Sequence, residues 1–297
     1  MTLSTVTQPK PLEGICIVSL ALNLPGPAAL MRCQQMGATC TKLEPPAGDP
    51  MRHYNAVAYA ALHTGVACQT ADLKTADGQA MLHQSLGEAD VLLTSFRPSA
   101  LHKLGLDFNT LHQQHPQLCL VAIVGGAGSQ AEEPGHDLTY LAEHGLVTGL
   151  DLPATLYADM GGSVMASEAV LSVLMQRAKK GEGFGKGVFA EVALTGAAAY
   201  LALPRAWGLT LPGAAVGGGH AGYQIYACSD GRLAVAALEP HFAARLCAAA
   251  DVALSSPADM FSSATQTGLA AFFKHQACAE LTALALKHDI PLHAMPR

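Results

Sequence analysis

The sequence predicts an α/β fold in which a large lobe, built on a parallel Rossmann-like sheet, precedes a smaller α+β lobe. Short apolar runs alternate with helical patterns along the first part of the chain, and glycine- and proline-rich turns separate them. Apolar strands alternating with helices are typical of a parallel sheet covered on both faces. The composition changes near 205–220, so we expect a large domain over residues 1–205 and a small domain over 206–297.

The first elements form a βαβ unit. The apolar run at 15–20 is followed by a turn at Asn23–Pro27, a helical pattern at 28–37 and a strand-like run at 39–44. Strand, glycine turn, helix and strand in this order are typical of one such unit. The pattern then repeats, with helices expected at 77–86 and 110–115 and strands at 89–96 and 117–128.

Parallel open sheets bind ligands at the carboxyl ends of their strands. Three segments leave strand ends in this way and are candidate binding loops: GDPMRH at 48–53, SFRPS at 95–99 and GGAGS at 125–129. The glycines of the last segment do not follow a first strand with GxGxxG spacing, so we expect no dinucleotide fingerprint.

The pattern at 161–178 predicts a long helix, with Asp159 just before its start. Unpaired N–H groups and the positive end of the helix dipole stabilise a carboxylate in that place, so we expect a low pKa for Asp159. A further helix is expected at 192–207. Two strands joined by Ser229–Gly231 then form a hairpin, and the remainder is expected to be helical.

The composition limits the possible partners. The 297 residues are 50% hydrophobic and only 13% charged, with a net charge of −6. Charged residues make up about 25% of an average protein, so we expect much of the surface to be hidden by a partner subunit or a second layer. The chain has no basic run, which argues against nucleic acid as a partner. The longest apolar stretch, 188–204, contains Glu191 and Pro204, so no membrane span is expected.

The eight cysteines indicate reduced thiols. None forms a C-x-x-C pair, and no Cys/His cluster has zinc-finger spacing, so no metal site is expected. The N-terminal segment MTLSTVTQPKPLEG is polar and has no signal-peptide core. Together these features favour a cytoplasmic protein.

Two short segments carry the candidate chemistry. GHDLTY at 135–140 contains His136, and YADMGG at 157–162 contains Asp159. An imidazole and a carboxylate suit abstraction and return of a proton near neutral pH. Spacing alone leaves other roles open, because a single histidine is more often a surface group and Asp159 could be only a helix N-cap.

Several blocks in order resemble the family III CoA-transferases: PLEGICIVSLA, MGATCTKLEPPAGDPMR, TADLKTADGQAM, ADVLLTSFRPSALHKLGLD, GHDLTY and ADMGG. Within that family the chain is most similar to the α-methylacyl-CoA racemases, a choice favoured by YACSDGRLAVAALEPHF. The resemblance implies a large and a small lobe in an interlocked homodimer, with each site between the large lobe of one subunit and the small lobe of the other.

The resemblance also implies roles for particular residues. His136 and Asp159 would be the proton-transfer groups, with Glu239 of the EPHF segment nearby. Acyl-CoA would be the substrate, with coenzyme A bound only as part of it and no permanent cofactor. Expected binding residues are Lys74, Phe96, Arg97, Lys103, Gly135, Asp137 and Tyr140.

The implied reaction inverts the α-carbon of a 2-methyl-branched acyl-CoA thioester. One group removes the α-hydrogen, backbone N–H groups near the glycines hold the enolate, and the other group returns a proton to the opposite face. In the transferase branch Asp159 would instead be a nucleophile that forms an anhydride and then a thioester with CoA. The racemase is the first hypothesis and the transferase the alternative.

Some features depart from the family pattern. Val66, Ala67 and Pro45 stand where basic residues that hold CoA would be expected, and each lost contact would cost about 1.5–3 kcal/mol. The sequence given ends at HDIPLHAMPR, before the segment that the resemblance implies should return to the large lobe. These departures motivate a third hypothesis, a degenerate paralogue without enzymatic activity.

Overall fold

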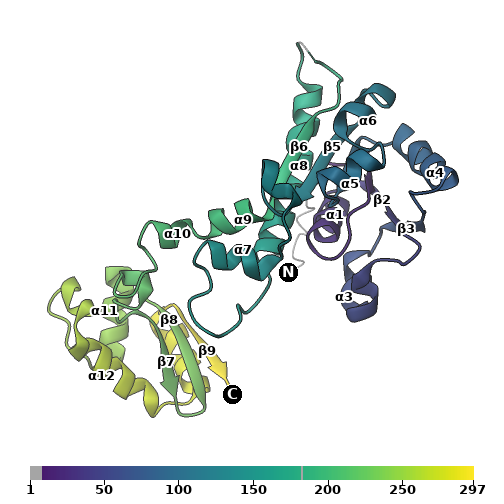
Figure 1. Cartoon of the computed structure of the whole chain (residues 1–297). Helices are drawn as coiled ribbons and strands as arrows, with labels where there is room; N and C mark the ends of the chain where they lie inside the picture. Colours follow the sequence, from purple (N-terminus) through teal and green to yellow (C-terminus); the bar gives the residue numbers. More distant parts are fainter. Residues whose placement is uncertain (1–8, 182) are drawn as a thin grey trace. The chain divides into compact units, whose positions relative to one another are not determined.

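A computed structural model describes residues 9–181 and 183–297 (Figure 1). The chain divides into two compact units, one ending at Ala202 and one covering Leu203–Arg297. The boundary expected from the sequence lies three residues later, after residue 205. The expected α/β class is confirmed, because the first unit is built on a six-stranded parallel sheet.

The order of the strands, β3-β2-β1-β4-β5-β6, reverses direction between β1 and β4. β1 pairs in parallel with both β2 and β4, so the chain first winds outward in one direction and then in the other. Ligands of such sheets bind where the order reverses. The strands are β1 Cys16–Ser19, β2 Thr39–Glu44, β3 Ala67–Thr70, β4 Val91–Thr94, β5 Cys119–Val124 and β6 Phe189–Ala193.

Helices cover both faces of the sheet, as expected from its continuous apolar strands. Successive residues of β4 enter different clusters. Leu93 packs in the core that includes residues of α1 and α8, whereas Leu92 packs in the core that includes residues of α4, α5 and α6. The helices of this unit are α1 Pro25–Gln35, α2 Pro50–Tyr54, α3 Ala56–Leu62, α4 Ala76–Gly87, α5 Pro98–Lys103, α6 Phe108–Gln114, α7 Asp137–Glu143, α8 Tyr157–Ala178 and α9 Leu194–Leu201, with a 3₁₀ turn η1 at Gly128–Glu132.

Two expectations for this unit are wrong. The long helix begins at Tyr157 rather than at 161, so Asp159 lies inside its first turn. The helix expected at 192–207 starts instead as strand β6, whose backbone pairs with β5 from Phe189 to Ala193. Pairing with the sheet edge overrides the local helical pattern, and the helix begins only at Leu194.

The second unit has a three-stranded antiparallel sheet, β7-β8-β9, and its own apolar core. The predicted hairpin is confirmed, since β7 and β8 pair antiparallel across Ser229–Asp230. Strand β9, which the sequence did not predict, pairs with the free side of β8. The elements are α10 Leu203–Ala206, η2 Ala215–Gly217, β7 Tyr223–Cys228, β8 Gly231–Ala236, α11 Pro240–Ala249, η3 Pro257–Phe261, α12 Ser263–Lys274, α13 Cys278–His288 and β9 Leu292–Pro296.

Within the described ranges, every helix is too short or too polar to cross a lipid bilayer.

Candidate functional site

A cavity of about 570 Å³ opens in the first unit where β1, β4 and β5 end. The loop after β1 contributes Asn23, the loop after β4 contributes Phe96 and Arg97, and the end of β5 contributes Gly125. The starts of α7 and α8 complete the wall. The cavity therefore lies at the reversal of strand order, where a parallel sheet of this type binds its ligand.

His136 lies at the entrance to α7, as the residue that caps its N-terminus. The Thr139 hydroxyl accepts a hydrogen bond from the His136 backbone N–H (3.0 Å) and donates one to the His136 carbonyl (2.8 Å). This pair of bonds fixes the backbone of His136, while the side chain is exposed and lines the cavity. The backbone that carries the imidazole is thus fixed, and the exposed imidazole is accessible to a ligand.

Asp159 lies in the first turn of α8 and lines the same cavity. Its backbone N–H donates to Oδ1 of Asp137 at 3.0 Å. Asp137 is 4% exposed and is the first residue of α7. One buried carboxylate therefore joins the starts of the two helices that present His136 and Asp159.

The pKa of Asp159 is raised from 3.8 to about 6. Burial is the largest cause, the charge of Asp137 adds to it, and His136 acts in the opposite direction. The low pKa expected from the helix dipole is therefore wrong. The dipole stabilises a carboxylate by about 0.3–1 kcal/mol at an exposed site, which is less than the combined cost of burial and a neighbouring carboxylate.

Tyr140 is buried against the cavity wall between two glycines. A Cβ atom on Gly135 would lie 2.4 Å from the Tyr140 ring, and one on Gly125 would lie 2.6 Å from its hydroxyl oxygen. Burial, followed by the charge of Asp159, raises the pKa of Tyr140. The glycines at these two positions therefore make room for an aromatic ring beside the candidate proton-transfer groups.

The two glycines after Asp159 have a packing role. A Cβ on Gly162 would lie 2.3 Å from Leu194 Cδ2, and one on Gly161 would lie 3.2 Å from Leu201 Cδ1. Both residues are inside α8, where backbone N–H groups bond to carbonyls of the preceding turn. The N–H groups of these two glycines are therefore engaged within the helix, and the expectation that N–H groups near glycines hold an enolate stays a prediction.

The residues expected to bind CoA separate into two places. Phe96, Arg97, Gly135, Asp137 and Tyr140 line the cavity that contains His136 and Asp159. Lys74 and Lys103 line a second cavity of about 590 Å³ between the start of α4 and the end of α5. Both lysines are exposed, so their ammonium groups are accessible to an anionic group.

Glu239 belongs to the second unit. It is exposed and occupies the N-cap position of α11, directly before Pro240, without a capping hydrogen bond from its side chain. Its placement relative to His136 and Asp159 stays a prediction.

Other cavity residues were not identified from the sequence, among them Asn23, Tyr54 and Glu133. Asn23 belongs to the turn predicted after the first strand, and its φ of 64° lies in the left-handed region. Tyr54 follows the GDPMRH loop, which was singled out as a candidate binding loop. Nothing in the sequence around Glu133 distinguishes it from an ordinary surface acid.

Comparison with known proteins identifies the family. Residues 12–295 match the model of CoA-transferase family III, so the chain belongs to that family. The human α-methylacyl-CoA racemase is 30% identical over 249 residues, which are 78% of this chain and 62% of the racemase. The cinnamoyl-CoA:phenyllactate CoA-transferase of Clostridium sporogenes is 35% identical over 151 residues, 46% of this chain and 36% of the transferase.

Solved structures agree with this assignment. A CAIB/BAIF family protein from Brucella suis superposes with a TM-score of 0.80 at 25% identity, over 98% of this chain and 85% of that one. The chain spans about half the length of several of the curated relatives that it matches. Similarity therefore gives the family and its fold, and relatives of both reaction types occur among the matches.

Proposed function

We propose that this protein is an acyl-CoA racemase that inverts the α-carbon of a 2-methyl-branched acyl-CoA thioester. One observation carries the proposal: His136 and Asp159, which belong to different helices, line a single cavity at the carboxyl edge of the sheet. Inversion by proton transfer needs two groups that act on one carbon from different sides.

The pKa of about 6 supports a role for Asp159 in proton transfer. A carboxyl group with this value takes up and releases a proton near neutral pH, so it can serve as either acid or base. Each direction of a racemisation requires one of these two protonation states.

The reaction would proceed through an enolate. The thioester acidifies the α-hydrogen, one of the two groups removes it as a proton, and the electron pair moves onto the thioester oxygen. The second group then donates a proton to the opposite face of the α-carbon. Exposed Arg97 at the cavity wall, with Lys74 and Lys103 at the second cavity, would bind the phosphates of the CoA portion. The protein would act as the homodimer that the family resemblance implies.

The test is solvent exchange during racemisation. In deuterated water the wild-type protein should racemise a 2-methylacyl-CoA and introduce deuterium at the α-carbon. His136→Gln and Asp159→Asn should each lose racemisation. The matched variants His288→Gln and Asp151→Asn, both at exposed positions, should retain it. Absence of racemisation by the wild-type protein with any 2-methylacyl-CoA would contradict the proposal.

A CoA-transferase is the second candidate, because the matched relatives include transferases and Asp159 faces the cavity. In that reaction the Asp159 carboxylate would attack the carbonyl carbon of the acyl thioester, break its C–S bond, release CoA as the thiolate and form a mixed anhydride. Hydroxylamine would convert this adduct to a hydroxamate at Asp159, which mass spectrometry detects. His136→Gln would then retain transfer, whereas a racemase would lose its activity. A degenerate paralogue would show neither reaction and no calorimetric binding of CoA or acyl-CoA at millimolar ligand.

A further inference from the structure

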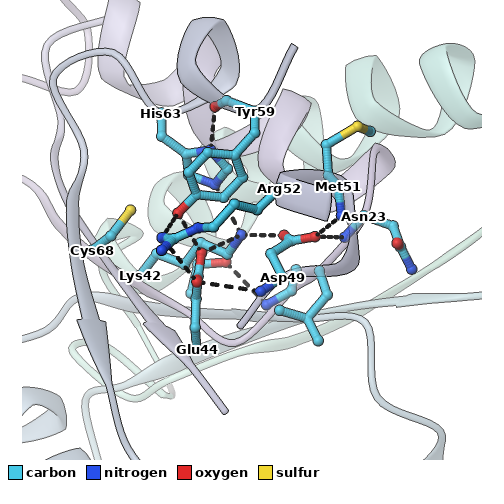
Figure 2. Close-up of polar contacts among 12 residues, drawn as sticks. Asn23, Lys42, Glu44, Asp49, Met51, Arg52, Tyr59, His63 and Cys68 are labelled. Atoms are coloured by element: carbon cyan, nitrogen blue, oxygen red, sulfur yellow. Dashed lines mark hydrogen bonds and ion pairs between the residues drawn. The ribbon is translucent and has the colours of Figure 1, made fainter. Parts of the chain in front are cut away.

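Lys42 on β2 is fully buried among polar partners (Figure 2). Its Nζ atom lies 3.3 Å from Oε1 of Glu44 and 2.8 Å from Nε2 of His63, and it forms an ion pair with Oδ2 of Asp49. Lysine is almost never fully buried unless it is paired. Lys42, Glu44, Asp49 and His63 therefore form a buried polar cluster.

The hydrogen bonds of the cluster are complete around Lys42. An ammonium group has three N–H donors, and Glu44, Asp49 and His63 supply three acceptors. His63 Nδ1 donates to the carbonyl of Tyr59 at 2.6 Å, so its Nε2 atom presents a lone pair to Lys42. His63 is therefore neutral in this arrangement.

The charges of the cluster also balance. Arg52 contacts Oε2 of Glu44 at 3.4 Å, and the Tyr59 hydroxyl donates to Oε1 of Glu44 at 2.7 Å. The two cations Lys42 and Arg52 thus pair with the two carboxylates of Glu44 and Asp49. Glu44, His63 and Cys68 lie close enough together to bind a metal ion. The ammonium group of Lys42, however, already contacts both Glu44 and His63 and supplies the positive charge that a metal ion would bring.

The cluster reaches the cavity through Asp49. While its Oδ2 atom pairs with Lys42, its Oδ1 atom accepts hydrogen bonds from the backbone N–H groups of Asn23 (3.1 Å) and Met51 (2.9 Å). The side chain of Asn23 accepts a bond from the Tyr54 hydroxyl (3.2 Å), and both Asn23 and Tyr54 line the cavity. One carboxylate thus connects a buried cation to the backbone of the cavity wall.

The Asn23 backbone has a left-handed conformation, with a φ of 64°. Asparagine adopts this region more readily than most residues, and the bond to Asp49 holds the turn in this conformation. The turn that it forms leads directly into α1 at Pro25, which also lines the cavity. A shift of this turn would move part of the wall of the cavity that Asp159 also lines.

We infer that Lys42 is a positioning residue of this site: it orients Asp49, which holds the Asn23 turn in the wall of the acyl-CoA cavity. The inference rests on the proposed function for the identity of the ligand. The contacts that carry it are independent of the reaction. A purely structural role would stabilise the protein without a specific effect on the turn at 22–25 or on the Michaelis constant.

Three variants separate these roles. Lys42→Met removes the ammonium. Asp49→Asn keeps the volume and leaves Lys42 paired with Glu44, so it is the variant expected to fold if Lys42→Met does not. Tyr59→Phe is the matched control. It removes a hydroxyl that donates to Glu44 and accepts from Arg52, on the side of the cluster that does not contact Asn23.

Hydrogen–deuterium exchange of the native protein, read by mass spectrometry, tests the positioning itself. The peptide that contains residues 22–25 should exchange at least tenfold faster in Lys42→Met and at least threefold faster in Asp49→Asn. It should be unchanged in Tyr59→Phe. Peptides from the buried strand β5, in the same unit, report whether the variants are folded.

Kinetics test the consequence for the ligand. The Michaelis constant for acyl-CoA should rise at least tenfold in Lys42→Met and at least threefold in Asp49→Asn, with a smaller change in kcat, while Tyr59→Phe stays within twofold of wild type.

Unchanged exchange at 22–25 in a folded Lys42→Met or Asp49→Asn protein would overturn the inference, as would equal effects in Tyr59→Phe. If the wild-type protein does not act on acyl-CoA, the proposed function fails, and the exchange experiment still decides the role of Lys42.

Discussion

Oδ1 of Asp137 accepts a hydrogen bond from the backbone N–H of Asp159 at 3.0 Å, and this contact joins the starts of α7 and α8. The same carboxylate raises the pKa of Asp159 through its charge. Asp137 therefore both places Asp159 beside the cavity and adjusts its affinity for a proton. An asparagine at position 137 would keep the acceptor and remove the charge.

Asp137→Asn should lower the pKa of Asp159, because one of the two causes that raise it is lost. The acidic limb of the pH–rate profile for α-proton exchange should move to lower pH, with little change in the fold. Exposed Asp151→Asn should leave the profile unchanged. A profile in Asp137→Asn that matches wild type would show that Asp137 does not act on the titrating group.

Asp159→Asn should stabilise the protein while abolishing its activity. A pKa raised from 3.8 to about 6 corresponds to about 3 kcal/mol, and partial exposure reduces this, so we expect a gain of about 1–2 kcal/mol in the free energy of unfolding at pH 7. The folded state binds more protons than the unfolded state between the two pKa values, so wild-type stability falls as pH rises through this window.

The pH dependence of unfolding checks this prediction. The advantage of Asp159→Asn should be complete above pH 6 and should disappear as the pH approaches 3.8. Urea unfolding of both proteins across this range measures it. A variant that is less stable than wild type at pH 7 would mean that the carboxylate makes favourable contacts which outweigh its burial.

Gly135→Ala should damage the site by displacing Tyr140. The new methyl group would lie 2.4 Å from the Tyr140 ring, which is buried and cannot move without disturbing its neighbours. We expect a loss of about 1–3 kcal/mol in stability and at least tenfold in activity. Gly149→Ala is the control, because a Cβ there meets nothing within 4 Å. Equal activity in the two variants would contradict the packing argument.

Lys74→Ala and Lys103→Ala should each weaken the binding of acyl-CoA if the second cavity holds its phosphates. A lost charge-assisted contact costs about 1.5–3 kcal/mol, and exposure to solvent makes the lower value the relevant one, which is about tenfold in the dissociation constant. The effect should shrink at high salt. Exposed Lys287→Ala is the control. Calorimetry showing no change in either variant would remove the second cavity from the binding site.

The central strands of the sheet were predictable because β1, β4 and β5 are continuous apolar runs, whereas the more exposed edge strands β3 and β6 were not predicted. β4 and β5 are buried along their whole length, and the hairpin between β7 and β8 has polar turn residues at its centre. The start of α8 was not predictable, because Leu156 at its N-cap makes no side-chain cap. The bond that anchors this end comes from Asp137 in another helix, a tertiary contact that local patterns do not encode.

The candidate site was predictable only where family motifs cover it. His136, Asp159 and Arg97 were found in this way and share one cavity. The elevated pKa of Asp159 depends on how deeply the chain buries it, which the sequence does not give. Lys42 was missed for a similar reason: a lysine in a strand is ordinarily a surface residue, and only the fold encloses it with Asp49 and His63.

The same limit applies to the cysteines. In the described ranges all eight cysteines are free thiols. Their spacing gave no sign that Sγ of Cys228 and Sγ of Cys278 would lie 3.4 Å apart beside Asp230. The hairpin and the start of α13 bring them together, and sequence separation hides this proximity.

The most direct measurement of the central claim is α-hydrogen exchange in deuterated water with each enantiomer of a 2-methylacyl-CoA supplied separately. If His136 and Asp159 act on opposite faces of one carbon, each single variant should exchange one enantiomer without inverting it and fail to exchange the other. The two variants should show opposite preferences. A His136→Gln or Asp159→Asn protein that still interconverts both enantiomers, or two variants with the same preference, would contradict the account.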